Sequence, residues 1–366
     1  MKIAILNIYS GLVNRGAETV AQALATRWAE NHDVTLFCGG SLTRTNYKVH
    51  IVPGVGVEQP QPNNNLASKI SHWLYRDAHS QQTREFTYRC LDELAKFEPN
   101  IILTFNGSEQ IRILQTKSKF RKNIVAGMHG QTENRRWKLA GRENTRMIEM
   151  APAGIVALNE IQYELLKNTA KKKTKIIQIS NGVDLDFFNP KADKTRLPLQ
   201  PPIVLCVAGL QTYKRVELLI RAVAKTNFSL MILGDGPLRD ELTIIGTRLL
   251  GRSRFEIMTV NHDLIPGIYT AANVFSLPSM SIEAFGVAYL EAMACNLPIV
   301  APDDKVRRSI IGEAGIYTDV TNAKLYGEAL IKANNMSWKD IPRIQANKYD
   351  WGLISQKYLD FFNELM

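Results

Sequence analysis

The stretch SIEAFGVAYLEAMACNLPIV, residues 281–300, combines a loop, a helix and a strand within a short span. Pro278 ends the apolar run before it, and Gly286 interrupts its pattern, so its first residues are predicted to form a loop. A helix should then begin near Val287, and a strand should follow at Ile299–Ala301. A loop that leads from one strand into a helix and on to another strand is typical of a parallel sheet covered by helices.

The same alternation of short apolar runs and amphipathic stretches continues along the whole chain. The predicted strands are Lys2–Ile8, Asp33–Cys38, Lys48–Val52, Asn100–Phe105, Asn123–Met128, Gly154–Leu158, Ile203–Ala208, Ser229–Leu233, Arg254–Met258, Val274–Leu277 and Ile299–Ala301. The predicted helices include Gly16–Glu30, Ala67–Phe97, Ile161–Thr169, Lys214–Lys225, Leu238–Leu250, Leu264–Ala271, Val287–Cys295 and Asn322–Asn335. The pattern indicates an α/β fold of doubly wound, Rossmann-like sheets.

A chain of 366 residues is long for one hydrophobic core, so two domains are expected. The stretch SNGVDLDFFNP at 180–190 is followed by residues 191–202, which are rich in proline and polar side chains and are predicted to be a linker. The expected division is an N-terminal domain at 1–182 and a C-terminal domain at 183–349. Ligands of such sheets bind outside the carboxyl ends of the strands, so a cleft between two facing domains is the expected binding site.

The last stretch, WGLISQKYLDFFNEL at 351–365, has apolar residues at helical spacing. It is predicted to form a helix with one buried face, made of Leu353, Ile354, Tyr358, Phe361, Phe362 and Leu365.

The composition is that of an ordinary soluble globular protein, with 45% hydrophobic and 22% charged residues. No apolar run approaches the roughly 18 residues that would span a bilayer. The N-terminal stretch MKIAILNIYSG is predicted to be a strand rather than a signal peptide. The cysteines are far apart and lack metal-site spacing, so they are expected to be reduced, buried thiols of a cytoplasmic protein: Cys38, Cys90, Cys206 and Cys295.

The net charge of +10 is concentrated in the first half of the chain. Residues 1–180 hold 25 basic and 15 acidic residues, whereas residues 181–366 hold 20 of each. The basic clusters are KSKFRK at 117–122, RRWKLAGRENTR at 135–146 and KKKTK at 171–175. A basic face attracts phosphates, anionic lipid or nucleic acid, and the alternative is a solvated surface without a partner.

Two carboxylates in the opening stretch suggest a site for a sugar or phosphate. Glu283 should lie in the loop, and Glu291 about one turn inside the helix among small or apolar neighbours. The start of this helix leaves N–H groups without helical partners, at Phe285, Gly286, Val287 and Ala288. Such donors suit phosphate or sugar oxygens, and the glutamates can accept hydrogen bonds from hydroxyls. Alternatively, Glu283 is a simple helix cap and Glu291 a surface charge.

The stretch resembles the signature of the retaining GT-B glycosyltransferases of family 4. These enzymes carry two glutamates separated by seven residues, with Phe-Gly after the first, usually as E-G-F-G followed by E-A-M-A-x-G-x-P. The chain has Glu283-Ala284-Phe285-Gly286, with Ala284 in place of a glycine, and then Glu291-Ala292-Met293-Ala294-Cys295-Asn296-Leu297-Pro298.

The resemblance extends through the N-terminal half. Arg15-Gly16-Ala17-Glu18 is similar to the family's G-G-A-E loop, where a glycine lets the backbone approach a diphosphate or acceptor. Met128-His129-Gly130 follows a predicted strand and resembles the family's H-G, whose histidine contacts the donor sugar. Asn181-Gly182-Val183-Asp184 is similar to the hinge between the two domains.

The C-terminal half carries two further matches. The run Gly209-Leu210-Gln211-Thr212-Tyr213-Lys214-Arg215 resembles G-R-L-x-x-x-K-G, and Lys214 matches the lysine that binds the diphosphate. Gly209 stands where the family has an arginine, so half of the usual cationic clamp is missing. Arg215 is expected to compensate only weakly, because its side chain should point elsewhere. Gly234-Asp235-Gly236-Pro237 matches the family's turn after a strand.

The resemblance implies a hexosyltransferase that uses a nucleoside-diphosphate sugar, with UDP or GDP as the nucleotide, and needs no metal. His129 and Glu283 are the expected catalytic residues. The expected donor-binding residues are Gly16, Lys214, Ala284, Phe285, Gly286, Val287 and Glu291. The spacing of Asp184 and Asp186 also suits manganese, but they follow a predicted domain junction rather than an apolar strand, so no metal site is expected there. In this family the last helix, 350–366, crosses back onto the first domain.

The acceptor is left open as a glycan, a small molecule or a lipid-linked molecule. The basic N-terminal half suggests peripheral contact with the inner face of a membrane by a cytoplasmic protein, and no nucleic-acid partner is expected. Two other functions are considered: a sugar-nucleotide epimerase of GT-B fold, and a non-enzymatic binder of an anionic polymer or lipid.

Overall fold

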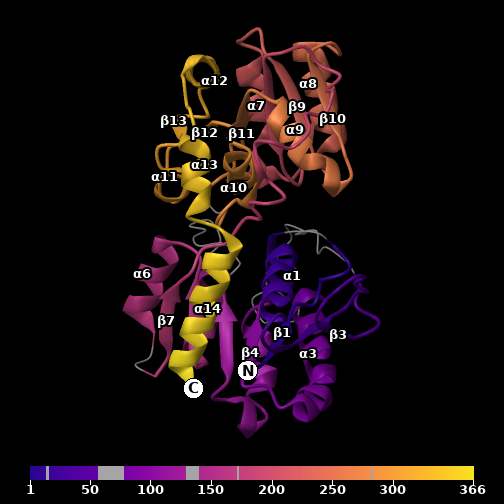
Figure 1. Cartoon of the computed structure of the whole chain (residues 1–366), viewed down its shortest axis with the longest axis vertical. Coiled ribbons are helices and arrows are strands. Elements are labelled where there is room, and N and C mark those ends of the chain that lie inside the picture. The colour runs from indigo at the N-terminus through magenta and orange to yellow at the C-terminus, as the bar shows by residue number, and fades with distance from the viewer. Residues whose placement is uncertain (14–15, 57–77, 129–139, 171–172, 282) are drawn as a thin grey trace, which may run out of the picture. The chain divides into compact units, whose positions relative to one another are not determined.

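The computed structural model describes residues 1–13, 16–56, 78–128, 140–170, 173–281 and 283–366. The chain divides into two compact units. Unit 1 consists of Met1–Ser180 together with Ile354–Met366, and unit 2 consists of Asn181–Leu353. Each unit has its own sheet and its own core, and Figure 1 labels the elements of both.

Unit 1 is built on a sheet whose described strands are all paired in parallel. Their order is β3-β2-β1-β4-β5-β6-β7. The central strands are almost wholly buried, because helices cover both faces of such a sheet. The strands are β1 (Lys2–Leu6), β2 (Asp33–Cys38), β3 (Lys48–Ile51), β4 (Ile101–Thr104), β5 (Ile124–Gly127), β6 (Gly154–Ala157) and β7 (Lys175–Gln178).

The described helices of unit 1 are α1 (Gly16–Trp28), α3 (Ala78–Phe97), α4 (Ser108–Leu114), η1 (Ser118–Phe120), α5 (Ala140–Glu149) and α6 (Glu160–Thr169). They are joined by the greater part of α14 (Trp351–Leu365), the last helix of the chain. The Trp28 ring meets the rings of Tyr358 and Phe362 edge-on, and Phe361 packs over Gly154. Most of the predicted apolar face of α14 is therefore core. Leu353 is an exception, since 56% of it is exposed.

Unit 2 contains a second sheet of parallel strands in the order β10-β9-β8-β11-β12-β13. Its strands are β8 (Ile203–Val207), β9 (Ser229–Leu233), β10 (Phe255–Met258), β11 (Val274–Ser276), β12 (Ile299–Pro302) and β13 (Gly315–Thr318). Its described helices are η2 (Thr212–Lys214), α7 (Val216–Val223), α8 (Arg239–Leu250), η3 (His262–Leu264), α9 (Ile265–Ala271), α10 (Val287–Ala294), α11 (Lys305–Ile311), α12 (Ala323–Asn335) and α13 (Ile341–Asn347).

Both strand orders contain a point where the direction of winding reverses. In unit 1 the chain leaves β1 for β2 and β3, and later returns to the other side of β1 with β4. In unit 2 it leaves β8 for β9 and β10, and returns with β11. The loops that follow the two strands at such a switch point diverge to opposite faces of the sheet, and ligands bind between them. Ligands are therefore expected to bind between the loops after β1 and β4 in unit 1, and between those after β8 and β11 in unit 2.

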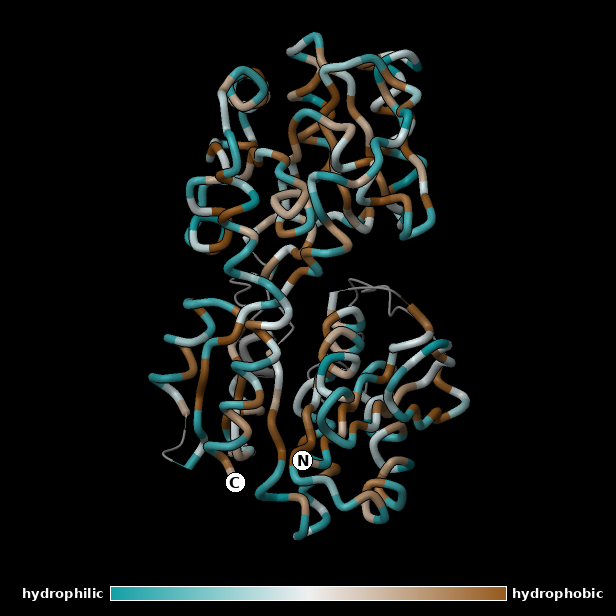
Figure 2. Tube along the Cα trace, in the orientation of Figure 1, coloured by the Kyte–Doolittle hydropathy of each residue, from teal (hydrophilic) through white to brown (hydrophobic). Residues whose placement is uncertain are grey.

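The sequence prediction missed several short elements. The strands β7 and β13 were not predicted. Both are edge strands with intermediate or exposed residues, which is also true of β3, a strand that was predicted. The helices α4 and α5 lie between predicted strands, where helical stretches were expected without stated bounds, whereas α11 and α13, with seven residues each, were not predicted. Figure 2 shows how hydrophobic and hydrophilic residues alternate along the trace of both units.

The predicted linker at 191–202 makes tertiary contacts with the rest of unit 2. It belongs to unit 2, where the N–H of Thr195 donates to the carbonyl of Gly267 in α9 at 3.0 Å. Leu199 within it is buried. Proline-rich composition therefore marked a segment without helix or strand, but not one without tertiary contacts.

The turn after β9 packs closely against the loop after β8. Gly234 has a φ of 154°, and a Cβ placed on it would lie 1.9 Å from the carbonyl oxygen of Ala208. Gly236 is also close-packed, with a Cβ position 2.7 Å from the carbonyl oxygen of Leu210. Only glycine fits at these points, which explains the Gly-Asp-Gly-Pro sequence of the turn.

Replacing Gly234 by alanine is expected to destabilise the protein by about 2 kcal/mol, since a backbone atom that cannot move aside blocks the new methyl group. Gly209→Ala is a matched control in the neighbouring loop, because a Cβ there meets nothing within 4 Å. Urea unfolding of both variants checks the prediction, and equal midpoints for the two would contradict it.

Candidate functional site

Two charged side chains meet at the switch point of unit 2. Lys214 comes from η2, which follows β8, and Glu283 comes from the loop that follows β11. The Lys214 ammonium and the Glu283 carboxylate form an ion pair. Both side chains are mostly buried, with 12% and 16% of their surfaces exposed. The structure therefore brings together a cation and an anion that are far apart in the sequence, at the edge of the sheet where ligands are expected.

The N-terminus of α10 lies next to this pair. Gly286 caps the helix with a φ of 86° and offers no side-chain cap, and its Cβ position is 3.8 Å from Cγ of Glu283. Phe285 is buried, and its ring packs edge-on against Tyr349. Within the described residues no hydrogen bond takes up the N–H groups of Phe285, Gly286 or Val287. These N–H groups can therefore donate hydrogen bonds to a ligand oxygen beside the Lys214–Glu283 pair.

Glu291 is held on the same helix by a tyrosine. The hydroxyl of Tyr269, a fully buried residue of α9, donates to Oε2 of Glu291 at 2.8 Å. Burial raises the pKa of the Glu291 carboxyl to about 7, although the hydrogen bond from Tyr269 acts in the opposite direction. The alternative of a simple surface charge is therefore wrong for Glu291. Its free carboxylate oxygen can accept a hydrogen bond from a hydroxyl group.

The raised pKa of Glu291 predicts a dependence of stability on pH. Between its ordinary pKa of 4.5 and about 7, the folded state holds a proton that the unfolded state has released, so folding becomes less favourable as the pH rises through this window. Glu291→Gln should remove this loss of folding stability, because glutamine does not titrate. Its side-chain carbonyl oxygen still accepts a hydrogen bond from the Tyr269 hydroxyl. The variant should gain stability relative to the wild type at about pH 8 compared with about pH 5. Unfolding curves at both pH values test this, with exposed Glu328→Gln as the control.

The loop before Glu283 is held by two arginines that the sequence reasoning did not assign to it. Arg215 donates from Nε to the carbonyl of Pro278 at 2.9 Å and from Nη2 to that of Ser279 at 3.2 Å. Arg307 donates from Nη2 to the carbonyl of Met280 at 2.7 Å and to the Ser279 hydroxyl at 2.8 Å. The Arg215 guanidinium is thus engaged with the backbone of this loop, and its weak compensation for Gly209 stays a prediction. The two arginines fix the loop that carries Glu283.

Arg307 is fully buried on α11, and its Nε has no hydrogen-bond partner among the described residues. A signal for it exists in the sequence: it precedes Ile310 and Ile311 by three and four residues, so it lies on the apolar face of its helix. A charged residue at such a position needs a polar partner inside the fold.

The other predicted site residues are placed as follows. Gly16 begins α1 in unit 1 and is exposed, with nothing within 4 Å of its Cβ position. Ala284 is nearly buried, at 9% exposure. His129 lies outside the described residues. Asp184 accepts hydrogen bonds from the N–H groups of Asp186 and Phe187, which places it in a local turn.

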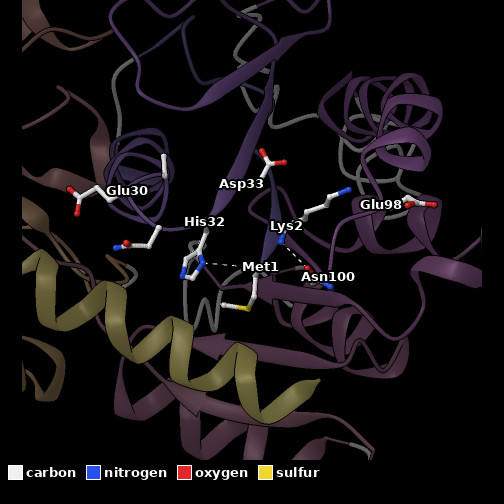
Figure 3. A pocket seen from close by; sticks show the side chains of 9 residues that line it. Met1, Lys2, Glu30, His32, Asp33, Glu98 and Asn100 are labelled. Carbon is white, nitrogen blue, oxygen red and sulfur yellow. Dashed lines mark hydrogen bonds between the residues drawn. The ribbon is translucent and has the colours of Figure 1, made fainter.

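Figure 3 shows a shallow hollow in unit 1 that belongs to neither switch point. It is lined by residues at the starts of β1 and β2 and before β4, at the opposite edge of the sheet from the loops described above. His32 there is close to the amino terminus, with its Nδ1 3.3 Å from the Met1 nitrogen. Burial and the neighbouring ammonium lower the pKa of His32.

In the described parts of the chain, no group of three or more His, Cys, Asp or Glu side chains is placed to hold a metal ion. The helices within those parts are also too short or too polar to cross a bilayer. The cysteines are confirmed as buried free thiols.

Models of two known protein families together match almost the whole chain. The family described as Glycosyltransferase Family 4 matches residues 14–187, and the family Glycosyl transferases group 1 matches residues 188–350. A Campylobacter jejuni N-acetylgalactosamine-N,N'-diacetylbacillosaminyl-diphospho-undecaprenol 4-alpha-N-acetylgalactosaminyltransferase is 30% identical over 164 residues, 43% of this chain and 44% of that protein. A Mycolicibacterium smegmatis GDP-mannose-dependent alpha-(1-6)-phosphatidylinositol monomannoside mannosyltransferase is 31% identical over 199 residues, 49% of this chain and 52% of that protein. The chain thus matches about half the length of these curated relatives.

Solved structures show the same fold over the full chain. A sucrose-phosphate synthase from Thermosynechococcus elongatus has a TM-score of 0.80 at 18% identity, covering 100% of this chain and 98% of that one. The Anabaena protein Alr3699/HepE, in complex with UDP and glucose, has a TM-score of 0.72 at 17% identity and covers 99% of both chains. With both halves matched to glycosyltransferase models and the fold shared along its length, the chain belongs to the family 4, group 1 glycosyltransferases of GT-B fold.

Proposed function

We propose that this protein is a retaining glycosyltransferase that moves a hexosyl group from a UDP- or GDP-sugar to an acceptor hydroxyl in the synthesis of a glycan, polysaccharide or glycolipid. The observation that carries the proposal is the meeting of Lys214, Glu283 and the α10 N-terminus at the switch point of unit 2. Such a site offers positive charge and N–H donors to a diphosphate, and a carboxylate to the sugar beside it.

The chemistry explains why these groups are needed together. Breaking the bond between sugar and diphosphate places positive charge on the sugar ring and negative charge on the leaving group. Lys214 and the α10 amides stabilise the leaving diphosphate, and Glu283 orients the sugar. Glu291 accepts a hydrogen bond from the ribose, and contact of His129 with the donor sugar is what the family resemblance implies. The leaving phosphate takes the proton of the acceptor hydroxyl, and the anomeric configuration is retained.

The acceptor is proposed to bind to unit 1. The names of curated relatives include acceptors with phosphate groups, namely a diphospho-undecaprenol, a phosphatidylinositol monomannoside and D-inositol 3-phosphate. The basic excess of the first half of the chain supports an acceptor of this kind. For a lipid-linked acceptor, the enzyme would work in the cytoplasm at the inner face of the membrane.

A thermal-shift screen with UDP-, GDP- and ADP-sugars identifies the donor, because a ligand that binds only the folded state raises the melting temperature. Transfer of the sugar is then followed with phosphorylated and lipid-linked acceptors. Consumption of the donor without any acceptor would point instead to an epimerase. Salt-sensitive binding of polyanions that does not need Glu283 or Glu291, without response to any sugar nucleotide, would point to a non-enzymatic binder.

We also propose that transfer needs no metal ion, since Lys214 and the α10 amides supply the positive charge. Activity should persist in EDTA. A requirement for manganese would contradict this proposal and would redirect attention to Asp184 and Asp186.

A further inference from the structure

One carbonyl group in unit 2 connects a buried arginine to the backbone of Glu283. The carbonyl oxygen of Met280 accepts a hydrogen bond from Nη2 of Arg307 at 2.7 Å and another from the N–H of Glu283 at 3.0 Å. A carbonyl oxygen has two lone pairs, so it can hold both donors at once. A single acceptor atom therefore lies between the guanidinium group of Arg307 and the main chain of Glu283.

The N–H of Met280 connects the same loop to the segment that carries Lys214. It donates to the carbonyl of Tyr213, the residue before Lys214, at 2.8 Å. The loop is thus bonded to η2 through its N–H and to α11 through its carbonyl. Because Lys214 and Glu283 form an ion pair, a shift of this loop would change how the two charges meet.

The guanidinium group of Arg307 is fixed at both ends. Nη2 also donates to the hydroxyl of Ser279 at 2.8 Å, and Nη1 lies 3.3 Å from Oδ2 of Asp304, the N-cap residue of α11. None of the Arg307 side chain is exposed. A buried cation is stable only when its charge and its N–H groups have partners, so these contacts leave the side chain little freedom. Its direction toward the loop is set before any ligand binds.

We propose that Arg307 is a positioning residue for sugar transfer, which acts through the carbonyl of Met280 to hold the backbone of Glu283 in place. The inference rests on the proposed function in taking Glu283 to orient the donor sugar. Arg307 is fully buried, so it acts through Glu283 and not by touching the donor. Precise placement matters, because a displacement of about 1 Å in a reacting group can cost ~10²-fold in rate.

The first experiment separates turnover from binding in Arg307→Met, which removes the charge and the donors but keeps a long side chain. The turnover number should fall by about tenfold to a hundredfold. The affinity for UDP or GDP, measured by calorimetry, should change little, since Lys214 and the α10 amides are still present. Arg307→Lys keeps a buried cation and should recover part of the loss. The matched control is Arg308→Met on the same helix, because Arg308 is 55% exposed and pairs with Asp303. It should behave like the wild type.

A double variant shows whether Arg307 acts through Glu283. When Glu283 is already alanine, Arg307→Met should lower the turnover number no further, because no carboxylate is left to position. Losses that multiply in Arg307→Met/Glu283→Ala would overturn the proposal. Equal turnover numbers for Arg307→Met and Arg308→Met would overturn it as well.

Hydrogen–deuterium exchange tests the same restraint without any turnover. Peptides that cover residues 278–285 should exchange faster in Arg307→Met than in Arg308→Met, because the N–H groups of Met280 and Glu283 are protected by hydrogen bonds of this loop. Faster exchange spread evenly over unit 2 would show a general structural role and contradict the proposal. If the local change appears but no sugar nucleotide is ever used, the proposed function fails and the restraint on Glu283 stands.

A milder variant decides the question if Arg307→Met does not fold. Ser279→Ala leaves the buried charge in place and removes the hydroxyl that accepts from Nη2 of Arg307. It should raise exchange in the same peptides and lower the turnover number by about threefold, the effect of one lost hydrogen bond. Exchange and turnover like those of the wild type would overturn the proposal.

Discussion

Replacing Glu283 by alanine should reduce sugar transfer by at least ~10²-fold, the typical loss when one positioned contact to the transition state is removed. Glu283 forms an ion pair with Lys214, so its removal also leaves that lysine without its carboxylate. A diphosphate would then meet an uncompensated cation. The affinity for UDP or GDP should therefore stay the same or increase while the turnover number falls.

Steady-state kinetics and calorimetry on the same preparation measure both effects. Glu328→Ala, an exposed glutamate on α12, has the same change of charge in the same unit and should behave like the wild type. Near-normal turnover of Glu283→Ala would remove Glu283 from the mechanism. A parallel loss of nucleotide affinity would mean that Glu283 supports the shape of the site rather than the reaction.

Replacing Lys214 by alanine should weaken binding of the nucleoside diphosphate by about tenfold to a hundredfold, since a charge-assisted contact to phosphate is lost. The effect should be large because no second cation stands at Gly209, and because Arg215 is engaged with Pro278 and Ser279. Glu283 would also be left facing the diphosphate without its partner. The loss should therefore appear in binding itself, and not only in turnover.

Calorimetric titration with UDP and GDP tests this, and the double variant Lys214→Ala/Glu283→Ala separates the two causes. If repulsion by Glu283 contributes, the double variant should bind more tightly than Lys214→Ala alone. Unchanged affinity in Lys214→Ala would show that the diphosphate is bound elsewhere. The role of Lys214 inferred from the family motif would then be wrong.

Much of the fold could be predicted because buried parallel strands are continuous apolar runs. The strands β1, β4, β8 and β9 stand out in this way, and the helix after Gly286 begins at Val287 as expected. The edge strands β7 and β13 could not be predicted in the same way. Their residues are half-exposed, but β3 has the same exposure and was predicted, so exposure alone does not explain why these two strands were missed.

The residue types of the candidate site were also readable. Glu283, Glu291 and Lys214 were identified by motif resemblance, and their roles remain predictions, as does that of His129. What the sequence did not reveal was which side chains hold them: the partnership of Lys214 with Glu283, and the contact of Tyr269 with Glu291.

By itself, then, the sequence determined the α/β class, the strand and helix pattern of the core, and the glycines and glutamates of the site, because these depend on local periodicity and on residue chemistry. Only the tertiary structure decided the contacts between distant segments. The order of strands in each sheet brings these segments together. Examples are the contact of Arg307 with the loop at 278–280, and the contacts of Glu109 with Arg84, Arg112 and Arg146. Parallel strands place the loops after β8 and β11, or after β1 and β4, at one edge regardless of their separation in the chain, and no local pattern encodes that proximity.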